Sequence, residues 1–231
     1  MAGFQITRQL RKMRRDWDRR ARENARHYVV TERNEWSDAE FFASGEVAMQ
    51  EDILNDLTNI CQGKQPHRLR VLEIGCGAGR VTRAFARFFG EVYAVDISPE
   101  MVRRARAAVA AFPNAHVFCN SGMDLAPVRA HCAEPFDFAF SSMVFQHIPN
   151  RDIIENYVRE VHAMLAPGGL FKFQVQGSPQ VREDPGDSWV GVPFSQAQAR
   201  EMADRCRFEM RYQAGQGDQY YWLWFFKALD C

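Results

Sequence analysis

The hydrophobic pattern of this 231-residue chain alternates short apolar runs with amphipathic segments. Apolar runs end at positions 74, 96, 119, 141 and 176, and most are followed by a turn and a stretch with helical periodicity. Strands that alternate with helices predict right-handed crossovers and a mostly parallel sheet, with ligands bound at the carboxyl ends of the strands. The pattern therefore predicts an α/β fold.

Two helices are expected before the first strand. The first covers about Gln5 to Tyr28, and the second begins at Ser37, where SerAspAlaGlu forms a capping box, and continues towards Cys61. A polar stretch around Gly63 then breaks the pattern. We therefore expect an N-terminal helical extension or lid at residues 1–64 and the main domain at residues 65–231.

The end of the chain departs from this alternation. Residues 178–193 are rich in turn residues, among them Pro179, Pro185, Gly186 and Gly191, and predict a mobile loop. A helix capped at Ser195 follows, and strand patterns at residues 208–213 and 219–227 are joined by GlyGlnGlyAsp. This arrangement predicts a terminal hairpin.

Charge changes the picture only locally. The chain has no net charge, but residues 1–33 hold ten Lys/Arg against four Asp/Glu and so carry +6, which leaves −6 on the remainder. Because the two signs are interleaved, we interpret the basic helix as a solvated face and do not expect nucleic acid as a partner.

The cysteines and apolar stretches bear on the compartment. Six cysteines show neither CxxC pairs nor Cys/His ligand spacing, so we predict no metal site and a reducing environment. No apolar stretch is long enough for a membrane span, and the first residues lack a signal-peptide core. A soluble, cytoplasmic protein without a membrane partner is expected; the pattern leaves its oligomeric state open.

The most informative stretch is VLEIGCGAGR, residues 71–80, where a buried-strand pattern meets a glycine turn and a helix start. Gly75, Gly77 and Gly79 permit positive φ and close backbone approach. Exposed amides at the helix start can face a ligand with a ribose or a phosphate-like end. Arg80 stands where the dinucleotide pattern GxGxxG needs its third glycine, and Glu73 precedes the first glycine by two residues.

With Asp96 closing the next strand, this segment resembles motif I of the class I S-adenosylmethionine-dependent methyltransferases of the small-molecule type. The resemblance covers roughly residues 69–176. It implies a Rossmann-like three-layer sandwich with a seven-stranded, mostly parallel sheet and an antiparallel last strand, preceded here by the N-terminal helices. It also implies S-adenosyl-L-methionine as the cofactor and S-adenosyl-L-homocysteine as its product.

The same resemblance implies roles for individual residues. The glycine loop, including Cys76, lies against the amino-acid end of the donor, Glu73 supports the methionine ammonium, and Asp96 binds both ribose hydroxyls. Arg80 either pairs with the donor carboxylate or is an ordinary exposed helix arginine. Ile97 either packs on adenine or belongs to the core.

Two further segments of the resemblance concern adenine and the methyl group. Ser121, Gly122 and Met123 are expected to receive the adenine edge, although Ser121 replaces the usual acid and Asp124 can instead cap the following short helix. The backbone carbonyl of Ser141 is expected to meet the methionine ammonium. Phe145 is expected near the point where donor and acceptor meet.

His147 is the candidate general base, because a histidine of near-neutral pKa can deprotonate an acceptor hydroxyl or amine. The alternative is a structural histidine that is hydrogen-bonded to backbone under the loop. Acceptor recognition or packing is expected from aromatic and amide side chains elsewhere, namely Trp17, Tyr28, Trp36, Phe41, Phe42, Gln174, Gln176, Tyr220, Trp222 and Trp224. For Trp17 and the three residues near the end of the chain, packing is the favoured interpretation.

These observations favour methyl transfer from S-adenosylmethionine to an oxygen or nitrogen of a small-molecule acceptor. A protein that binds the donor without transferring its methyl group remains an alternative. A nicotinamide-dependent oxidoreductase is disfavoured, because Arg80 interrupts the dinucleotide pattern and no TyrXxxXxxXxxLys pair follows. Nucleic-acid base methylation is disfavoured because SerSerMetVal stands where an Asn-Pro-Pro-Tyr/Phe signature would.

Overall fold

The computed structural model describes residues 2–184 and 186–229. Pro185 of the predicted loop and Cys231, the last of the six cysteines, lie outside the described residues. A seven-stranded sheet with the order β3-β2-β1-β4-β5-β7-β6 forms its centre. The strands are β1 (Arg70–Ile74), β2 (Glu91–Asp96), β3 (Ala115–Cys119), β4 (Phe136–Ser141), β5 (Leu165–Val175), β6 (Phe208–Ala214) and β7 (Tyr221–Lys227). The last strand, β7, is antiparallel to both its neighbours, as predicted, whereas β1 to β5 pair in parallel.

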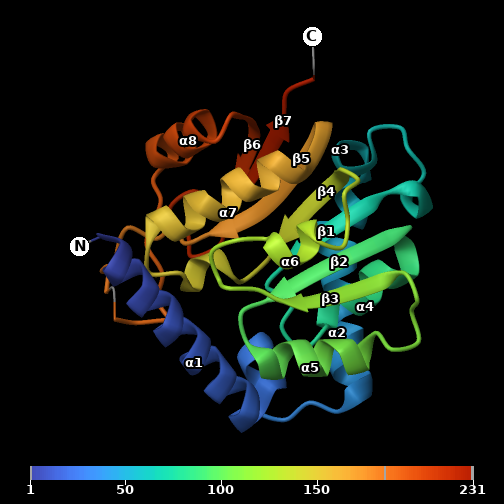
Figure 1. The fold of residues 1–231 in the computed structure, drawn as a ribbon, viewed down its shortest axis with the longest axis horizontal. Coiled ribbons are helices and arrows are strands. Elements are labelled where there is room, and N and C mark those ends of the chain that lie inside the picture. Colours follow the sequence, from blue (N-terminus) through green and yellow to red (C-terminus); the bar gives the residue numbers. More distant parts are fainter. Residues whose placement is uncertain (1, 185, 230–231) are drawn as a thin grey trace.

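Helices cover both faces of the sheet and make it the middle of three layers (Figure 1). One face packs against α6 (Ala126–Arg129), α7 (Arg151–Met164) and α8 (Gln196–Arg205). The other packs against α2 (Asp38–Asp52), α3 (Leu57–Cys61), α4 (Arg80–Phe88) and α5 (Pro99–Ala108). The predicted Rossmann-like sandwich is therefore confirmed.

Side-chain caps begin several helices, and those at Ser37 and Ser195 stand where the sequence predicted them. Ser37 and Glu40 form the capping box of α2, and Ser195 and Gln198 form that of α8. Ser98 caps α5 ahead of a proline at the first helical turn. These local signals survive because a capped amide needs no tertiary partner.

The second predicted helix is wrong in its continuity. It ends at Asp52, a short 3₁₀ turn covers Leu54–Asp56, and α3 follows. The Asp52 carbonyl accepts a hydrogen bond from the buried Lys172 ammonium on β5, at 2.5 Å. A residue distant in sequence thus bonds to a carbonyl at the point where the helix ends. No local sequence pattern predicts this end.

The AlaProGlyGly stretch at residues 166–169 has the composition of a turn, but it lies within β5, which begins at Leu165 directly after α7. Its pairing with β4 passes from Phe136 opposite Leu165 to Phe138 opposite Leu170. The four intervening residues therefore bulge out of the ladder, with Gly168 at φ +81°. The proline and glycines of this stretch thus form a bulge within the strand.

The first helix, α1 (Ala2–Val29), lies across the carboxyl ends of the strands (Figure 1). Its backbone departs from helical geometry at Asn24. Asp18 joins it to the start of α5, where one carboxylate oxygen accepts from the Ser98 hydroxyl at 3.1 Å and from the Glu100 amide at 3.0 Å. The helix is thereby fixed over the edge of the sheet where ligands bind in this class of fold.

Candidate functional site

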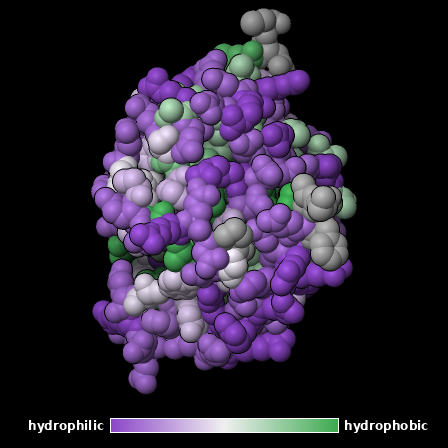
Figure 2. All heavy atoms as spheres, turned by 90° about the vertical axis from the view of Figure 1, so that its left-hand side faces the viewer, coloured by the Kyte–Doolittle hydropathy of each residue, from purple (hydrophilic) through white to green (hydrophobic). Residues whose placement is uncertain are grey.

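A cavity of about 330 Å³ lies at the carboxyl ends of the strands. Its walls come from the glycine loop after β1, from the ends of β2 and β3, from the loop after β4, and from α1 and residues 181–190. The view onto α1 shows a mostly hydrophilic surface, with apolar residues visible in small areas between the hydrophilic ones (Figure 2).

The glycine loop takes its shape from hydrogen bonds to β2. The amides of Gly75 and Cys76 both donate to the Val95 carbonyl, at 2.8 and 3.0 Å, and Gly75 has φ +76°. A Cβ on Gly75 would lie 2.1 Å from a methyl carbon of Val144. Only glycine fits here, because both the positive φ and the space exclude a side chain.

Gly77 lines the cavity as well, with φ +52°, but Gly79 does not line it. Gly79 precedes α4 at φ +85°, and a Cβ there would lie 3.0 Å from the backbone of Ala105 on α5. This third glycine permits helix packing rather than ligand approach.

Asp96 ends β2 and holds the loop. One carboxylate oxygen accepts from the Gly77 amide at 2.9 Å, and the other accepts from the Ser98 amide at 2.8 Å. Burial raises the pKa of Asp96 to about 6, against the opposing effect of these amides. Each oxygen retains a lone pair, so the carboxylate can still accept two hydroxyl groups.

Glu73 is buried on β1 and lines the cavity. Burial raises its pKa to about 7, although the nearby Thr82 hydroxyl and then the charge of Arg80 act in the opposite direction. Its Oε2 atom meets no hydrogen-bond donor in the part of the chain that the structure describes. The ammonium group of a ligand would supply the missing hydrogen-bond donor, so this site fits the amino-acid end of the expected methyl donor.

Arg80 is not an exposed helix arginine, because only 9% of its surface is accessible. One guanidinium nitrogen donates to the Ser44 carbonyl on α2 at 2.8 Å, and burial lowers its pKa. Its Nε atom has no acceptor among the described residues. A spare donor at the cavity wall agrees with a ligand carboxylate as its partner.

The predicted adenine segment is only partly at the cavity. Ile97 and Gly122 line it and touch each other, since a Cβ on Gly122 would lie 2.4 Å from Ile97 Cδ1. Ser121 and Met123 do not line it. Ser121 is exposed, and its hydroxyl donates to Asp124 at 2.7 Å, while Asp124 accepts from the Ala126 amide at 3.0 Å and so supports the start of α6.

Ser141 and Phe145 also do not line the cavity. The Ser141 hydroxyl donates to the Ile74 carbonyl at 3.1 Å and joins β4 to β1. Phe145 is fully buried; its ring stacks on Tyr157 and lies tilted against Phe173, with ring centroids 5.6 Å apart in each pair. Its apolar ring therefore packs in the core and does not face the cavity.

His147 lines the cavity with its ring between two tryptophans, 5.2 Å from Trp17 and 4.9 Å from Trp189 between centroids. Its Nδ1–H donates to the Trp189 carbonyl at 2.5 Å, and its Nε2 accepts from the Gln146 amide at 3.2 Å. The carbonyl can only accept, which sets this tautomer. Burial lowers the pKa of His147 to about 4, so the ring is neutral at pH 7.

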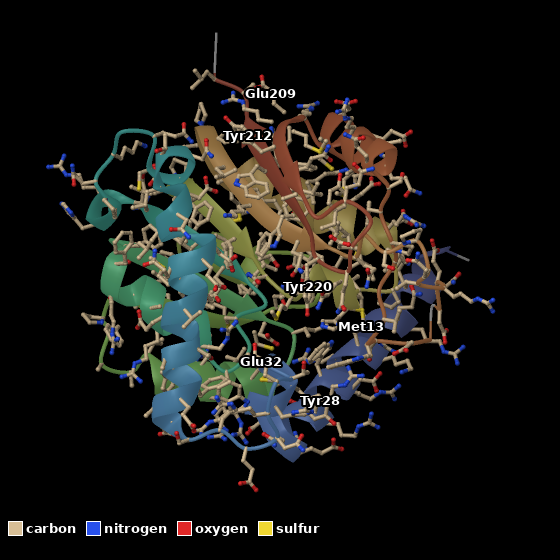
Figure 3. The ribbon with its side chains drawn as sticks, turned by 180° about the vertical axis from the view of Figure 1, so that it is seen from behind. Met13, Tyr28, Glu32, Glu209, Tyr212 and Tyr220 are labelled. Carbon is tan, nitrogen blue, oxygen red and sulfur yellow. The ribbon has the colours of Figure 1, made fainter. Side chains whose placement is uncertain are left out.

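The candidate acceptor residues separate into two groups. Trp17, Tyr28, Gln176 and Tyr220 line the cavity. Met13 and Tyr28 extend from α1 on the same side of the sheet as Tyr220, whereas Glu209 and Tyr212 lie on the outer strand β6 (Figure 3).

The remaining candidates do not line the cavity. Trp36, Phe41 and Phe42 pack with α1 and Met101, while Gln174 accepts from the Met143 amide at 2.8 Å. Trp222 and Trp224 lie over the Lys172 ammonium, whose distance to their ring centroids is 5.6 and 4.7 Å. Packing is therefore the role of these two tryptophans.

Sequence reasoning missed several lining residues, among them Met13, Asn120, Tyr157 and Trp189. The signal for Asn120 was its place after a strand end; the others come from segments whose approach depends on the tertiary fold. Among described residues, no cluster of His, Cys, Asp and Glu could hold a metal ion. Within the same residues, no helix is long and apolar enough to span a membrane.

The charged residues of the cavity gather at one end. Among the described lining residues, only Glu73, Arg80 and Asp96 carry acid or base side chains apart from His147. They surround the glycine loop at β1 and β2. A parallel sheet with such a loop and such an acid at its switch point defines a protein that binds a nucleoside-containing cofactor.

Comparison with known proteins identifies this cofactor. Residues 71–169 match the model of a family described as a methyltransferase domain. The malonyl-[acyl-carrier protein] O-methyltransferase of Salmonella typhimurium is 30% identical over 148 residues, which are 63% of this chain and 53% of that protein. The ubiquinone biosynthesis O-methyltransferase of Xanthomonas axonopodis pv. citri is 32% identical over 117 residues, which are 50% of this chain and 46% of that protein.

A solved structure agrees in fold. The magnesium protoporphyrin IX methyltransferase of Synechocystis, solved with bound SAH, superposes with a TM-score of 0.67 at 15% identity and covers 95% of this chain and 100% of that one. The chain spans about half the length of the curated relatives it matches. Residues 71–169 thus match a methyltransferase domain, and the chain is similar to methyltransferases in sequence and to S-adenosylmethionine-dependent methyltransferases in fold.

Proposed function

We propose that this protein transfers the methyl group of S-adenosylmethionine to an oxygen or nitrogen of an uncharged small molecule. One observation carries the proposal: the cavity has charged residues at the glycine loop and uncharged aromatic and amide side chains at its other end. The cofactor supplies an already activated methyl group when it is bound. The work left to the chain is to orient the acceptor and to exclude water.

The residues of the glycine-loop end would hold the donor. Glu73 meets the methionine ammonium through its unpaired oxygen, and Arg80 meets the carboxylate. Asp96 accepts the two ribose hydroxyls with the lone pairs that Gly77 and Ser98 leave free. Residues 1–64 form the extension whose first helix acts as a lid over residues 65–231.

The other end favours a hydroxyl acceptor on a planar, uncharged molecule. Trp17, Tyr28 and Trp189 offer flat apolar surfaces, and Gln146 and Gln176 offer neutral hydrogen-bonding groups. The names of the two relatives describe oxygen methylation, which also favours oxygen over nitrogen. A carboxylate acceptor would find no free cation among the described lining residues at this end.

His147 is proposed as the group that takes the acceptor proton. Its Nδ1–H is fixed by the Trp189 carbonyl, so Nε2 is the nitrogen left for the acceptor once the Gln146 amide moves aside. With a pKa of about 4 it is a weak base, and it would take the proton as the new bond to carbon forms rather than before.

Titration calorimetry with S-adenosylmethionine and S-adenosylhomocysteine tests the donor site. We expect both to bind the wild-type protein and expect Asp96→Ala to lose most of that affinity. Transfer of a labelled methyl group is then measured on phenols, aliphatic alcohols, amines, and carboxylic acids in free and carrier-linked form. Binding without transfer to any class would favour the donor-binding alternative, and a wild-type protein that binds neither ligand would refute the proposal.

His147→Ala tests the proposed base once an acceptor is known. We expect a hundred-fold or greater loss of kcat, with the affinity for S-adenosylhomocysteine unchanged. His131→Ala is the matched control, because His131 is an exposed histidine whose Nδ1 likewise bonds to a carbonyl. Unchanged turnover in His147→Ala would leave His147 a structural residue.

A further inference from the structure

Asn120 is the first residue after β3 and lies beside Asp96. Its backbone amide donates to the Asp96 carbonyl at 3.0 Å, and Cys119 is the register partner of Asp96 in the sheet. Asn120 lines the cavity, and only 3% of its surface is accessible. It therefore adjoins the residue proposed to hold the donor ribose, and it directly precedes residues 121–123, the segment expected to receive adenine.

The hydrogen bonds of Asn120 fix the orientation of its amide. The Nδ2 group donates to the Tyr157 hydroxyl at 2.7 Å and to the Asp124 carbonyl at 3.1 Å, which uses both of its hydrogens. Oδ1 must then point the other way, and it meets no donor among residues 2–184 and 186–229. A buried acceptor without a donor is costly, so a missing partner is expected there.

Tyr157 completes the arrangement. Its oxygen accepts from Asn120, so its own hydrogen is directed elsewhere, and no acceptor for it occurs in the described part of the chain. Burial raises the pKa of Tyr157, and the hydroxyl stays protonated. Asn120 thus has an unused acceptor and Tyr157 an unused donor, and both residues line the cavity.

We infer that this pair recognises the adenine of the methyl donor: Asn120 Oδ1 accepts from the exocyclic amino group, and the Tyr157 hydroxyl donates to N1, the ring nitrogen beside it. Adenine presents these two groups next to each other on one edge. The inference rests on the proposed function for the identity of the donor. It assigns to Asn120 the role of the acid that Ser121 replaces, since the Ser121 hydroxyl is exposed and donates to Asp124.

S-Inosylhomocysteine provides the test, because it carries a carbonyl in place of the amino group and a ring N–H in place of the acceptor nitrogen. Calorimetry compares it with S-adenosylhomocysteine for the wild type, Asn120→Ala, Tyr157→Phe and the control Ser121→Ala. We expect the wild type and Ser121→Ala to prefer the adenine form by ten-fold or more. In Asn120→Ala this preference should fall to within about three-fold, and in Tyr157→Phe it should fall partway.

The ratio of the two affinities within one variant does not depend on how much that variant is destabilised, and Tyr157→Phe provides a second reading if Asn120→Ala folds poorly. Full preference in both Asn120→Ala and Tyr157→Phe would overturn the inference, as would its loss in Ser121→Ala. These outcomes concern binding alone, so a protein that shows the expected ratios but transfers no methyl group would refute only the proposed function. A wild type that binds neither compound would refute both.

Discussion

Glu73 is a buried carboxylate that the ligand-free protein keeps at a cost, and Glu73→Gln measures that cost. Its pKa is raised from 4.5 to about 7 by burial. At pH 8 the charged form therefore costs the folded state about 3 kcal/mol relative to the unfolded chain. The amide removes this cost, but Arg80 loses a favourable neighbour, so we expect a net stabilisation of about 1–2 kcal/mol.

The sign of the pH dependence follows from the raised pKa. Between about pH 4.5 and 7 the folded protein binds more protons at Glu73 than the unfolded chain does, so this residue's contribution to stability is lost as the pH rises through that window. Glu73→Gln lacks this loss. Its advantage over the wild type should be present at pH 8 and absent near pH 4.5.

Urea unfolding without cofactor at pH 8 and at pH 5 measures the difference, and calorimetry with S-adenosylhomocysteine at pH 8 measures the function. We expect the variant to be more stable yet to bind about ten- to a hundred-fold more weakly, since the ammonium loses a charged partner. Glu209→Gln, at an exposed position on β6 (Figure 3), should change neither quantity. A less stable variant at pH 8, or a difference independent of pH, would refute the reasoning.

Two further predictions concern the loop and the lid. Gly75→Ala should abolish donor binding or destabilise the fold by several kcal/mol, because its Cβ would overlap Val144. Gly63 also has a positive φ but has open space around it, so Gly63→Ala should cost about 1 kcal/mol. Urea unfolding measures the stability of both variants, and calorimetry measures their donor binding. Arg20→Ala should raise the acceptor KM several-fold and speed proteolysis within residues 178–193, because Arg20 stacks on Trp17 and Trp189 and bonds to Ser188, while the exposed Arg19→Ala should behave as wild type.

The fold was predictable because its signals are local and repeated. The alternation of strands and helices specifies a parallel sheet, and the caps at Ser37, Ser98 and Ser195 mark helix starts without tertiary help. The break after Asp52 was not predictable, because its carbonyl is held by Lys172, a residue 120 positions away in the chain.

The sequence predicted residues that line the cavity where these residues lie at the carboxyl ends of the first two strands. Glu73 and Gly75 follow from the glycine motif and Asp96 from the end of the next strand, and the cavity includes all three. Ser121 and Phe145 follow from the same resemblance, but the cavity includes neither. Resemblance to a family predicts positions along the chain, whereas the direction of a side chain depends on its neighbours. The Ser121 hydroxyl donates a hydrogen bond to Asp124, and the Phe145 ring packs on Tyr157 in the core.

The acceptor end was the least predictable part because three distant segments build it. Trp17 comes from α1, His147 from the loop after β4, and Trp189 from residues 178–193, and their rings lie against one another. None of these three segments includes a residue of the glycine loop or Asp96. We therefore expect substitutions in this wall to alter the acceptor without disturbing donor binding, which agrees with the different names of relatives that match the same part of the chain. The choice of acceptor should accordingly follow the wall formed by α1 and residues 178–193 rather than the motif.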